Sequence, residues 1–209
     1  MAEAVFFDLW NTLLYCPTRG KVDAILRLLR LEDKLDYNKV ICEMYRTLFV
    51  DRSYGVERFF MELCSGNNGD SITKAASIWG SRLDDSDFFP ETEAVLAGLR
   101  GEYRLGLISN TDAAGAAHAR SRLGGYLEAM VMSCEVGAVK PDPIIYEAAL
   151  EELGVRAEDS WMVGDNVEVD VEGALNAGLN AILIDRNGAK MSGEYPVVRS
   201  LSEVAGAIR

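Results

Sequence analysis

The chain has 209 residues, 49% of them hydrophobic and 26% charged, values typical of a globular protein with one ordinary domain and a smaller lobe. Its formal net charge of −12 excludes nucleic acid and anionic membranes as expected partners, because binding to either needs basic patches. No apolar run approaches the ~20 residues that span a bilayer, and the N-terminal segment lacks the basic region of a signal peptide, so we expect a cytoplasmic protein.

Cysteine and histidine are too few and too scattered to suggest a site of their own. Because Cys16, Cys42, Cys64 and Cys134 show no paired spacing, we expect buried thiols rather than a disulfide framework or a metal site, which fits a reducing cytoplasm. The single histidine, His118, falls in a helix-like stretch and is expected to be a surface or packing residue. With no second candidate histidine, a Ser-His or Cys-His mechanism is disfavoured.

The first predicted element is a strand over Ala4–Leu9, an apolar run. It delivers Asp8 to a tight turn rich in small polar residues, which is how a strand presents a nucleophilic or metal-binding carboxylate at the edge of a sheet. Two positions later stands Trp10, whose indole can neither give nor take a proton in catalysis.

The segment from about Arg19 to Asp87 predicts helices throughout, because its apolar residues recur at helical spacing. The predicted helices are Val22–Leu31, Tyr37–Phe49, Val56–Leu63 and Ser71–Leu83, with a flexible turn at Ser65–Gly69. We interpret residues 17–87 as a helical insert between the first and second strands of a core made of residues 1–16 and 88–209. Pro90 is expected to mark the return to the core, at the first turn of a helix.

After the insert, strand-like and helix-like stretches alternate. Strands are predicted over Arg104–Ile108, Ala129–Ser133, Ser160–Val163 and Ala181–Ile184, and helices over Ala113–Leu123, Pro143–Leu153 and Val167–Ala177. This alternation predicts an α/β fold with a Rossmann-like parallel sheet covered by helices on both faces. Asp8, Ser109 and Asp165 each follow the end of a predicted strand, so they are expected to converge at the carboxyl edge, where active sites of such sheets form.

Four segments occur in the order of the motifs of the haloacid dehalogenase (HAD) superfamily, and the chain resembles that family. Asp8-Leu9-Trp10-Asn11-Thr12 is similar to motif I, Asp-x-Asp-x-Thr, and Leu107-Ile108-Ser109-Asn110-Thr111 is similar to motif II. Val139-Lys140-Pro141-Asp142-Pro143 resembles motif III, and Gly164-Asp165 followed by Asp170 resembles motif IV, Gly-Asp-x-x-x-x-Asp. The helical insert is similar to the family's C1 cap.

The resemblance implies a hydrolase in which Asp8 is the nucleophile and forms a covalent aspartyl intermediate. It implies that Lys140 supplies positive charge to Asp8 and to the transferred group, which Ser109, Asn110 and Thr12 would also bind. A Mg²⁺ ion would be held by Asp8, Asp165 and the backbone carbonyl of Trp10. Asp170 and Asn166 would play supporting roles, with Asp170 orienting Lys140 or a metal-bound water.

The acidic residues themselves also argue for a metal. Without a cation, Asp8, Asp165 and Asp170 would repel one another, with only Lys140 nearby. In the phosphatases of the family, the second aspartate of motif I is the general acid and base, a contribution typically worth about 10² to 10⁴-fold in rate. Trp10 stands in its place here, while its backbone carbonyl can still contact a metal.

Trp10 leaves three functional interpretations open. The first is a Mg²⁺-dependent phosphatase without the usual acid and base, suited to good leaving groups such as acyl or aryl phosphates. The second is a 2-haloacid dehalogenase, since those relatives carry an aromatic residue at this position and Tyr146 follows Lys140 at their spacing. Against it, dehalogenases have Ser where this chain has Asp165. They also need an arginine after motif I, for which the candidates are Arg19, Arg27, Arg30 and Arg46. The third is a weakly active or non-catalytic binding protein that keeps the fold and Mg²⁺.

Substrate choice is expected to depend on the helical insert, as it does in this family. The expected partner is a small anionic molecule, and the chain is expected to be a monomer or a homodimer. Four residues of the insert could face the site or form a solvated surface, and the surface is the favoured interpretation: Tyr45, Arg46, Arg52 and Tyr54.

Overall fold

A computed structural model describes residues 2–64, 69–188 and 194–208. Its central feature is a six-stranded sheet in the order β5-β4-β1-β6-β7-β8, in which every described pairing is parallel. The strands are β1 (Ala4–Phe7), β4 (Arg104–Ser109), β5 (Ala129–Met132), β6 (Ser160–Gly164), β7 (Asn180–Ile184) and β8 (Val197–Val198). The predicted α/β fold with a Rossmann-like parallel sheet is confirmed.

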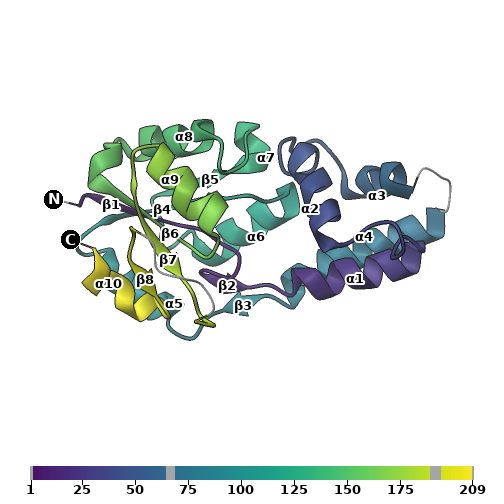
Figure 1. Ribbon diagram of the computed structural model, residues 1–209, viewed down its shortest axis with the longest axis horizontal. Helices are drawn as coiled ribbons and strands as arrows, with labels where there is room; N and C mark the ends of the chain where they lie inside the picture. The colour runs from purple at the N-terminus through teal and green to yellow at the C-terminus, as the bar shows by residue number, and fades with distance from the viewer. Residues whose placement is uncertain (1, 65–68, 189–193, 209) are drawn as a thin grey trace.

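Strand β1 lies in the middle of the sheet and is buried on both faces, which explains its uninterrupted apolar sequence. On one face, Val5 and Phe7 pack in a core with α5 (Thr92–Leu99), α6 (Ala113–Leu123) and α10 (Val204–Ala207). On the other face, Phe6 packs with α8 (Pro143–Leu153) and α9 (Gly173–Asn176). Figure 1 shows these two helical layers above and below the sheet.

Between β1 and β4, the chain is mainly helical from Thr18 to Asp84. It contains α1 (Thr18–Leu29), α2 (Tyr37–Arg46), α3 (Val56–Cys64) and α4 (Gly69–Asp84), which share a hydrophobic core of their own. A two-stranded antiparallel sheet of β2 (Leu14–Tyr15) and β3 (Asp87–Phe88) lies where the chain enters and leaves this segment. The four helices lie beyond the carboxyl ends of the parallel strands (Figure 1), so they face the edge where the motif residues gather.

The predicted first strand is too long, because the chain turns directly after Asp8. Strand β1 ends at Phe7, and the carbonyl of Leu9 accepts hydrogen bonds from the backbone N–H groups of Leu13 (3.0 Å) and Leu14 (2.9 Å). Asn11 adopts a left-handed conformation with φ 62°, which asparagine tolerates better than most residues. The turn places Asp8 and Trp10 at the edge of the sheet instead of within it.

The predicted helix over Val167–Ala177 is not one α-helix. Residues Val167–Glu172 form a π-helical turn, and only Gly173–Asn176 is α-helical. The carbonyl of Asn166 accepts from the N–H of Asp170 (2.9 Å) and of Val171 (3.3 Å), which widens the turn and directs Asp170 inward. Widened turns of this kind are frequent at functional sites.

Three smaller predictions need correction or fall outside the described residues. Pro90 lies before the core helix, because the carbonyl of Phe89 accepts from the N–H of Thr92 and α5 begins there. Cys42 is exposed, since it lies on the face of α2 opposite its buried residues, and Cys64 is half-buried; Cys16 and Cys134 are buried as expected. Of the predicted turn at Ser65–Gly69, only Gly69 is described, as the first residue of α4.

All four cysteines are free thiols. Among the helices that the structure describes, none is both long enough and apolar enough to cross a membrane.

Gly106 gives a test of the sheet packing. A Cβ atom at Gly106 would lie 2.6 Å from Cδ1 of Phe6, well inside van der Waals contact. We therefore expect Gly106→Ala to lower the free energy of unfolding by about 1–3 kcal/mol in urea denaturation. The control is Gly98→Ala in α5, where nothing lies within 4 Å of the new methyl group; its stability should hold or rise. Equal stability of both variants would contradict the packing described.

Candidate active site

Three strand ends meet at one edge of the sheet. The register aligns Phe7 of β1 with Leu107 of β4 and with Val163 of β6, so Asp8, Ser109 and Asp165 fall at neighbouring positions. The backbone N–H of Asp8 donates to the carbonyl of Val163 at 2.8 Å. One carboxylate oxygen from each of Asp8, Asp165 and Asp170 lies within 4.8 Å of the others. The predicted convergence of Asp8 with Asp165 is therefore observed, and Asp170 joins them.

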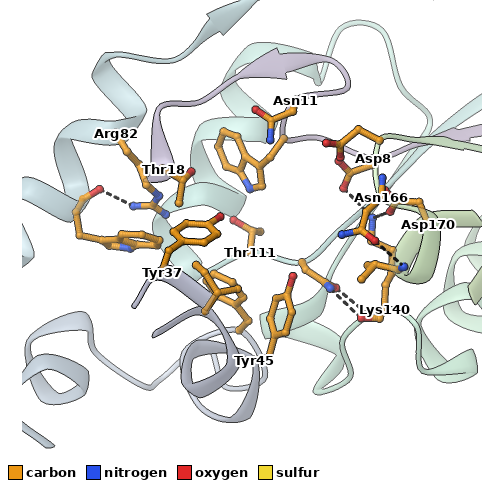
Figure 2. A pocket seen from close by; sticks show the side chains of 17 residues that line it. Asp8, Asn11, Thr18, Tyr37, Tyr45, Arg82, Thr111, Lys140, Asn166 and Asp170 are labelled. Atoms are coloured by element: carbon orange, nitrogen blue, oxygen red, sulfur yellow. Dashed lines mark hydrogen bonds and ion pairs between the residues drawn. The ribbon is translucent and has the colours of Figure 1, made fainter. Parts of the chain in front are cut away.

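Lys140 bridges two of these carboxylates. Its Nζ donates to Oδ1 of Asp8 at 2.7 Å and to Oδ1 of Asp170 at 2.6 Å, and its side chain is only 1% exposed. Asn110, just after β4, fixes the backbone of Lys140: its Oδ1 accepts from the lysine N–H at 2.8 Å, and its Nδ2 donates to the lysine carbonyl at 3.0 Å. Figure 2 shows Lys140 directed toward Asp8 and Asp170.

The glycine of the fourth motif makes room for Asp170. A Cβ atom on Gly164 would lie 2.3 Å from the carboxyl carbon of Asp170, so only glycine allows that carboxylate to pack against the end of β6. The other oxygen of Asp170, Oδ2, accepts from the backbone N–H of Asn166 at 3.0 Å. Asn166 also accepts at Oδ1 from the N–H of Val169 (3.1 Å), capping the π-helical turn.

The electrostatics of the cluster are unbalanced. The pKa of Asp8 is raised to about 7. Burial is the largest cause, Asp170 and Asp165 add to the rise, and Lys140 opposes it. Burial lowers the pKa of Lys140, but Asp170 and Asp8 raise it by more, so it stays well above its usual range. At Asp8, the positive charge of Lys140 is set against the negative charges of Asp170 and Asp165. A hard divalent cation with oxygen ligands would restore the balance, and these side chains are the donors such an ion prefers.

A cavity of about 240 Å³ lies between this cluster and the helical segment. Its sheet-edge wall carries Asp8, Asn110, Thr111, Lys140, Asp165, Asn166, Val169 and Asp170. Its opposite wall carries Thr18, Tyr37, Ile41, Tyr45, Phe49, Trp79 and Arg82 (Figure 2), and the turn residues Trp10 and Asn11 also line it.

Trp10 lines this cavity and does not turn away from it. It is half-buried and packs against the core on the α6 side of the sheet. Its Cζ2 atom lies only 3.2 Å from where a Cβ on Gly115 would be, so that glycine leaves space for the indole. At the position of the second motif I carboxylate, the site therefore presents an apolar surface.

Ser109 and Thr12, two predicted ligands of the transferred group, are fully buried but do not line the cavity. Their hydroxyl oxygens, with that of Thr111, have no hydrogen-bond partner within the part of the chain that the structure describes. Thr111 does line the cavity, so it is an additional candidate for binding an anion. The run Ser109-Asn110-Thr111 was a signal in the sequence that could have suggested it.

A buried ion pair that the sequence did not predict joins the helical segment to the core. Nη2 of Arg82, on α4, lies 2.7 Å from both carboxylate oxygens of Asp112, the N-cap residue of α6. Trp79 donates from Nε1 to Asp112 at 2.6 Å, and the Arg82 guanidinium stacks on the Trp79 ring at 3.9 Å. Both partners are nearly inaccessible to solvent. No local pattern signals this pair, because its residues are 30 positions apart.

Of the insert residues proposed from the sequence, Tyr45 lines the cavity. Its hydroxyl interacts with Asn110, and burial raises its pKa above the ordinary range. Arg46 pairs with Glu43, Arg52 pairs with Glu135, and Tyr54 donates to Glu62. These three residues do not line the cavity, which agrees with the favoured interpretation of a surface.

The structure gives the dehalogenase interpretation little support. None of Arg19, Arg27, Arg30 and Arg46 lines the cavity. Among the described residues that line the cavity, the arginine is Arg82, which is paired with Asp112. The hydroxyl of Tyr146 donates to the carbonyl of Val169 beneath the site, and the side chain is fully buried.

This arrangement of aspartates and lysine at the edge of a parallel sheet is the site of a hydrolase family. Residues 2–178 match the family model of haloacid dehalogenase-like hydrolases, and the chain belongs to that family.

Curated relatives are phosphatases. The chain is 41% identical to the glyceraldehyde 3-phosphate phosphatase of Methanothermobacter thermautotrophicus over 198 residues, 88% of this chain and 86% of that protein. It is 31% identical to the N-acylneuraminate-9-phosphatase of Homo sapiens over 210 residues, 89% of this chain and 84% of that protein. A 2-haloacid dehalogenase from Pseudomonas syringae pv. Tomato DC3000 shares the fold, with a TM-score of 0.73 over 99% of this chain and 98% of that one, at 22% identity. The curated relatives favour a phosphatase over a dehalogenase.

The Arg82–Asp112 pair can be tested by its effect on stability. Arg82→Met keeps much of the side-chain volume but leaves the Asp112 carboxylate buried without its cation, so we expect a loss of about 3 kcal/mol in the free energy of unfolding. Urea denaturation followed by tryptophan fluorescence measures it. The control, Arg46→Met, removes an exposed ion pair with Glu43 and should change little. A loss in Arg82→Met no larger than in the control would contradict the assignment.

Proposed function

We propose that the protein is a Mg²⁺-dependent phosphatase that acts on a small phosphorylated molecule through an aspartyl-phosphate on Asp8. The observation that carries the proposal is the cluster of Asp8, Asp165 and Asp170 within 4.8 Å, with Lys140 bonded to two of them. Two curated relatives that align with this chain over most of their length are phosphatases, and they support the same activity. Asp165 supports a metal-dependent reaction over dehalogenation, because dehalogenases of the family carry Ser there.

In this proposal, the free oxygen of Asp8 attacks phosphorus while Lys140 holds the other oxygen in place. The ester P–O bond breaks, and its electron pair leaves with the oxygen of the departing group. Trp10 has no proton to give, so the leaving oxygen takes its proton from solvent. Water then attacks phosphorus in the aspartyl-phosphate, releasing inorganic phosphate and restoring the carboxylate.

The residues present fit a divalent cation. Asp8, Asp165 and the backbone carbonyl of Trp10 would hold Mg²⁺, which would neutralise charge on the phosphoryl oxygens. Asp170 would keep Lys140 in position, with Asn166 holding the Asp170 carboxylate. Asn110 and Thr111, which line the cavity, would bind the phosphoryl group, while Thr12 and Ser109 lie buried behind the cavity wall.

The nucleophile and the metal are tested together. We expect hydrolysis of acetyl phosphate or p-nitrophenyl phosphate to require Mg²⁺, to stop in EDTA, and to fall by at least about 10³-fold in Asp8→Asn, which lacks the nucleophile. Glu43→Gln, a comparable carboxylate-to-amide change on the exposed side of α2, is the control for folding and assay. Turnover of 2-chloropropionate in EDTA, with no phosphate release, would replace this proposal with a dehalogenase. Mg²⁺ binding without any hydrolysis would favour a binding protein.

Trp10 is tested by restoring the missing acid. We expect Trp10→Asp to raise kcat on an alkyl phosphate such as glycerol 3-phosphate by about 10-fold or more, because general acid catalysis matters most for a poor leaving group. Trp10→Phe, which keeps an aromatic wall but adds no acid, controls for changes in packing. If both folded variants keep the parental rate on alkyl phosphates, proton transfer at position 10 does not limit turnover.

A further inference from the structure

The wall of the cavity that faces the charged cluster is rich in aromatic side chains. It is formed by α2 and the turn after it together with α4, and its side chains are mainly aromatic: Tyr37, Ile41, Tyr45, Phe49 and Trp79. Trp10 adds a further aromatic surface beside Asp8. Tyr37 and Tyr45 lie across the cavity from Asp8 (Figure 2), so a substrate with its phosphate at Asp8 would extend its other half toward this wall.

No spare positive charge lies on this wall. Among the described residues that line the cavity, the cations are Lys140 and Arg82. Lys140 is bonded to Asp8 and Asp170, and Arg82 is held by both oxygens of Asp112. Arg19 lies outside the cavity, exposed to solvent, with its guanidinium 4.5 Å from the ring of Tyr37. A second phosphate or a carboxylate on the substrate would enter this cavity without a partner, which is costly.

The chemistry at Trp10 selects for the same kind of molecule. Without an acid at position 10, the leaving oxygen departs as an anion, and a phenol, with a pKa of about 10 as in tyrosine, forms its anion far more readily than an aliphatic alcohol. The cavity, at about 240 Å³, is below the usual range for drug-sized ligands, which limits the leaving group to a small one.

On the basis of the phosphatase activity proposed above, we propose that the substrate is the phosphate monoester of a small, uncharged phenol, whose ring lies between Trp10 and the aromatic wall of α2 and α4. Attack by Asp8 on phosphorus breaks the P–O(aryl) bond. The aryl oxide leaves with the electron pair and is protonated by solvent, so no acid from the protein is needed. Stacking and edge contacts with aromatic side chains bind the ring.

The test compares kcat/KM for four compounds with Mg²⁺ present: acetyl phosphate, phenyl phosphate, 4-carboxyphenyl phosphate and glyceraldehyde 3-phosphate. We expect kcat/KM for phenyl phosphate to be at least about 10-fold higher than for either 4-carboxyphenyl phosphate or glyceraldehyde 3-phosphate. The carboxylate of 4-carboxyphenyl phosphate would enter the cavity without a partner, and glyceraldehyde 3-phosphate has the poorer leaving group. Acetyl phosphate separates the two proposals, because it barely extends toward the aromatic wall. If none of the compounds is hydrolysed, the proposed phosphatase activity is wrong. Turnover of acetyl phosphate without preference for phenyl phosphate would overturn the substrate assignment alone.

A charge placed on the wall should change the preference. Ile41 is half-buried on α2 and lines the cavity, so Ile41→Lys adds a positive charge to the wall. We expect the ratio of kcat/KM for 4-carboxyphenyl phosphate over phenyl phosphate to rise by at least about 10-fold, since the new ammonium group pairs with the carboxylate. Met61→Lys adds the same charge to α3, where Met61 is 51% exposed, and should leave the ratio as it was. An unchanged ratio in a folded Ile41→Lys would place the substrate away from this wall and overturn the proposal.

Discussion

The ammonium group of Lys140 is buried between the carboxylates of Asp8 and Asp170, and the rest of the site depends on this bridge. A buried charge is costly unless it is paired and hydrogen-bonded. Here the two bonds of 2.7 and 2.6 Å provide the pairing, and Asn110 fixes the lysine backbone. The bridge thereby ties the end of β1 to the turn after β6, through a lysine held from the end of β4. Three segments far apart in sequence are fixed by one cation.

The bridge lies beside a third carboxylate, that of Asp165. Asp165 joins the cluster, and burial with the neighbouring carboxylates raises the pKa of Asp8. A cation that binds here would lower that pKa and make Asp8 a better nucleophile. The site therefore combines closely spaced charges with the lack of an acid at position 10, because Trp10 presents indole where a carboxylate would stand. These two properties suit a leaving group that needs charge neutralisation and no acid.

Much of the fold could be predicted from the sequence because its signals are local. The bounds of α6 and α8 agree with prediction at both ends, since Asp112 and Asp142 cap their first turns and Gly154 ends α8 in a left-handed conformation. Asp8, Ser109 and Asp165 were predicted to converge because parallel strands end at a common edge, and Asp8 and Asp165 do meet there. Other features depend on distant partners. The π-helical turn brings Asp170 to Lys140, and Arg82 finds Asp112 only after the helical segment has folded against α6. The resemblance to motif IV implied the contact between Asp170 and Lys140, but no period or motif predicted the π-helical turn or the Arg82–Asp112 pair.

The proposed role of Asp8 is that of the nucleophile that accepts the phosphoryl group in a metal-dependent phosphatase. Its most direct test is mass spectrometry of the protein quenched in acid during steady turnover of acetyl phosphate, with and without Mg²⁺. We expect a phosphoryl group on the peptide that carries Asp8, present with Mg²⁺ and absent in EDTA. Steady release of phosphate with no adduct on that peptide, or with the adduct on another residue, would contradict it.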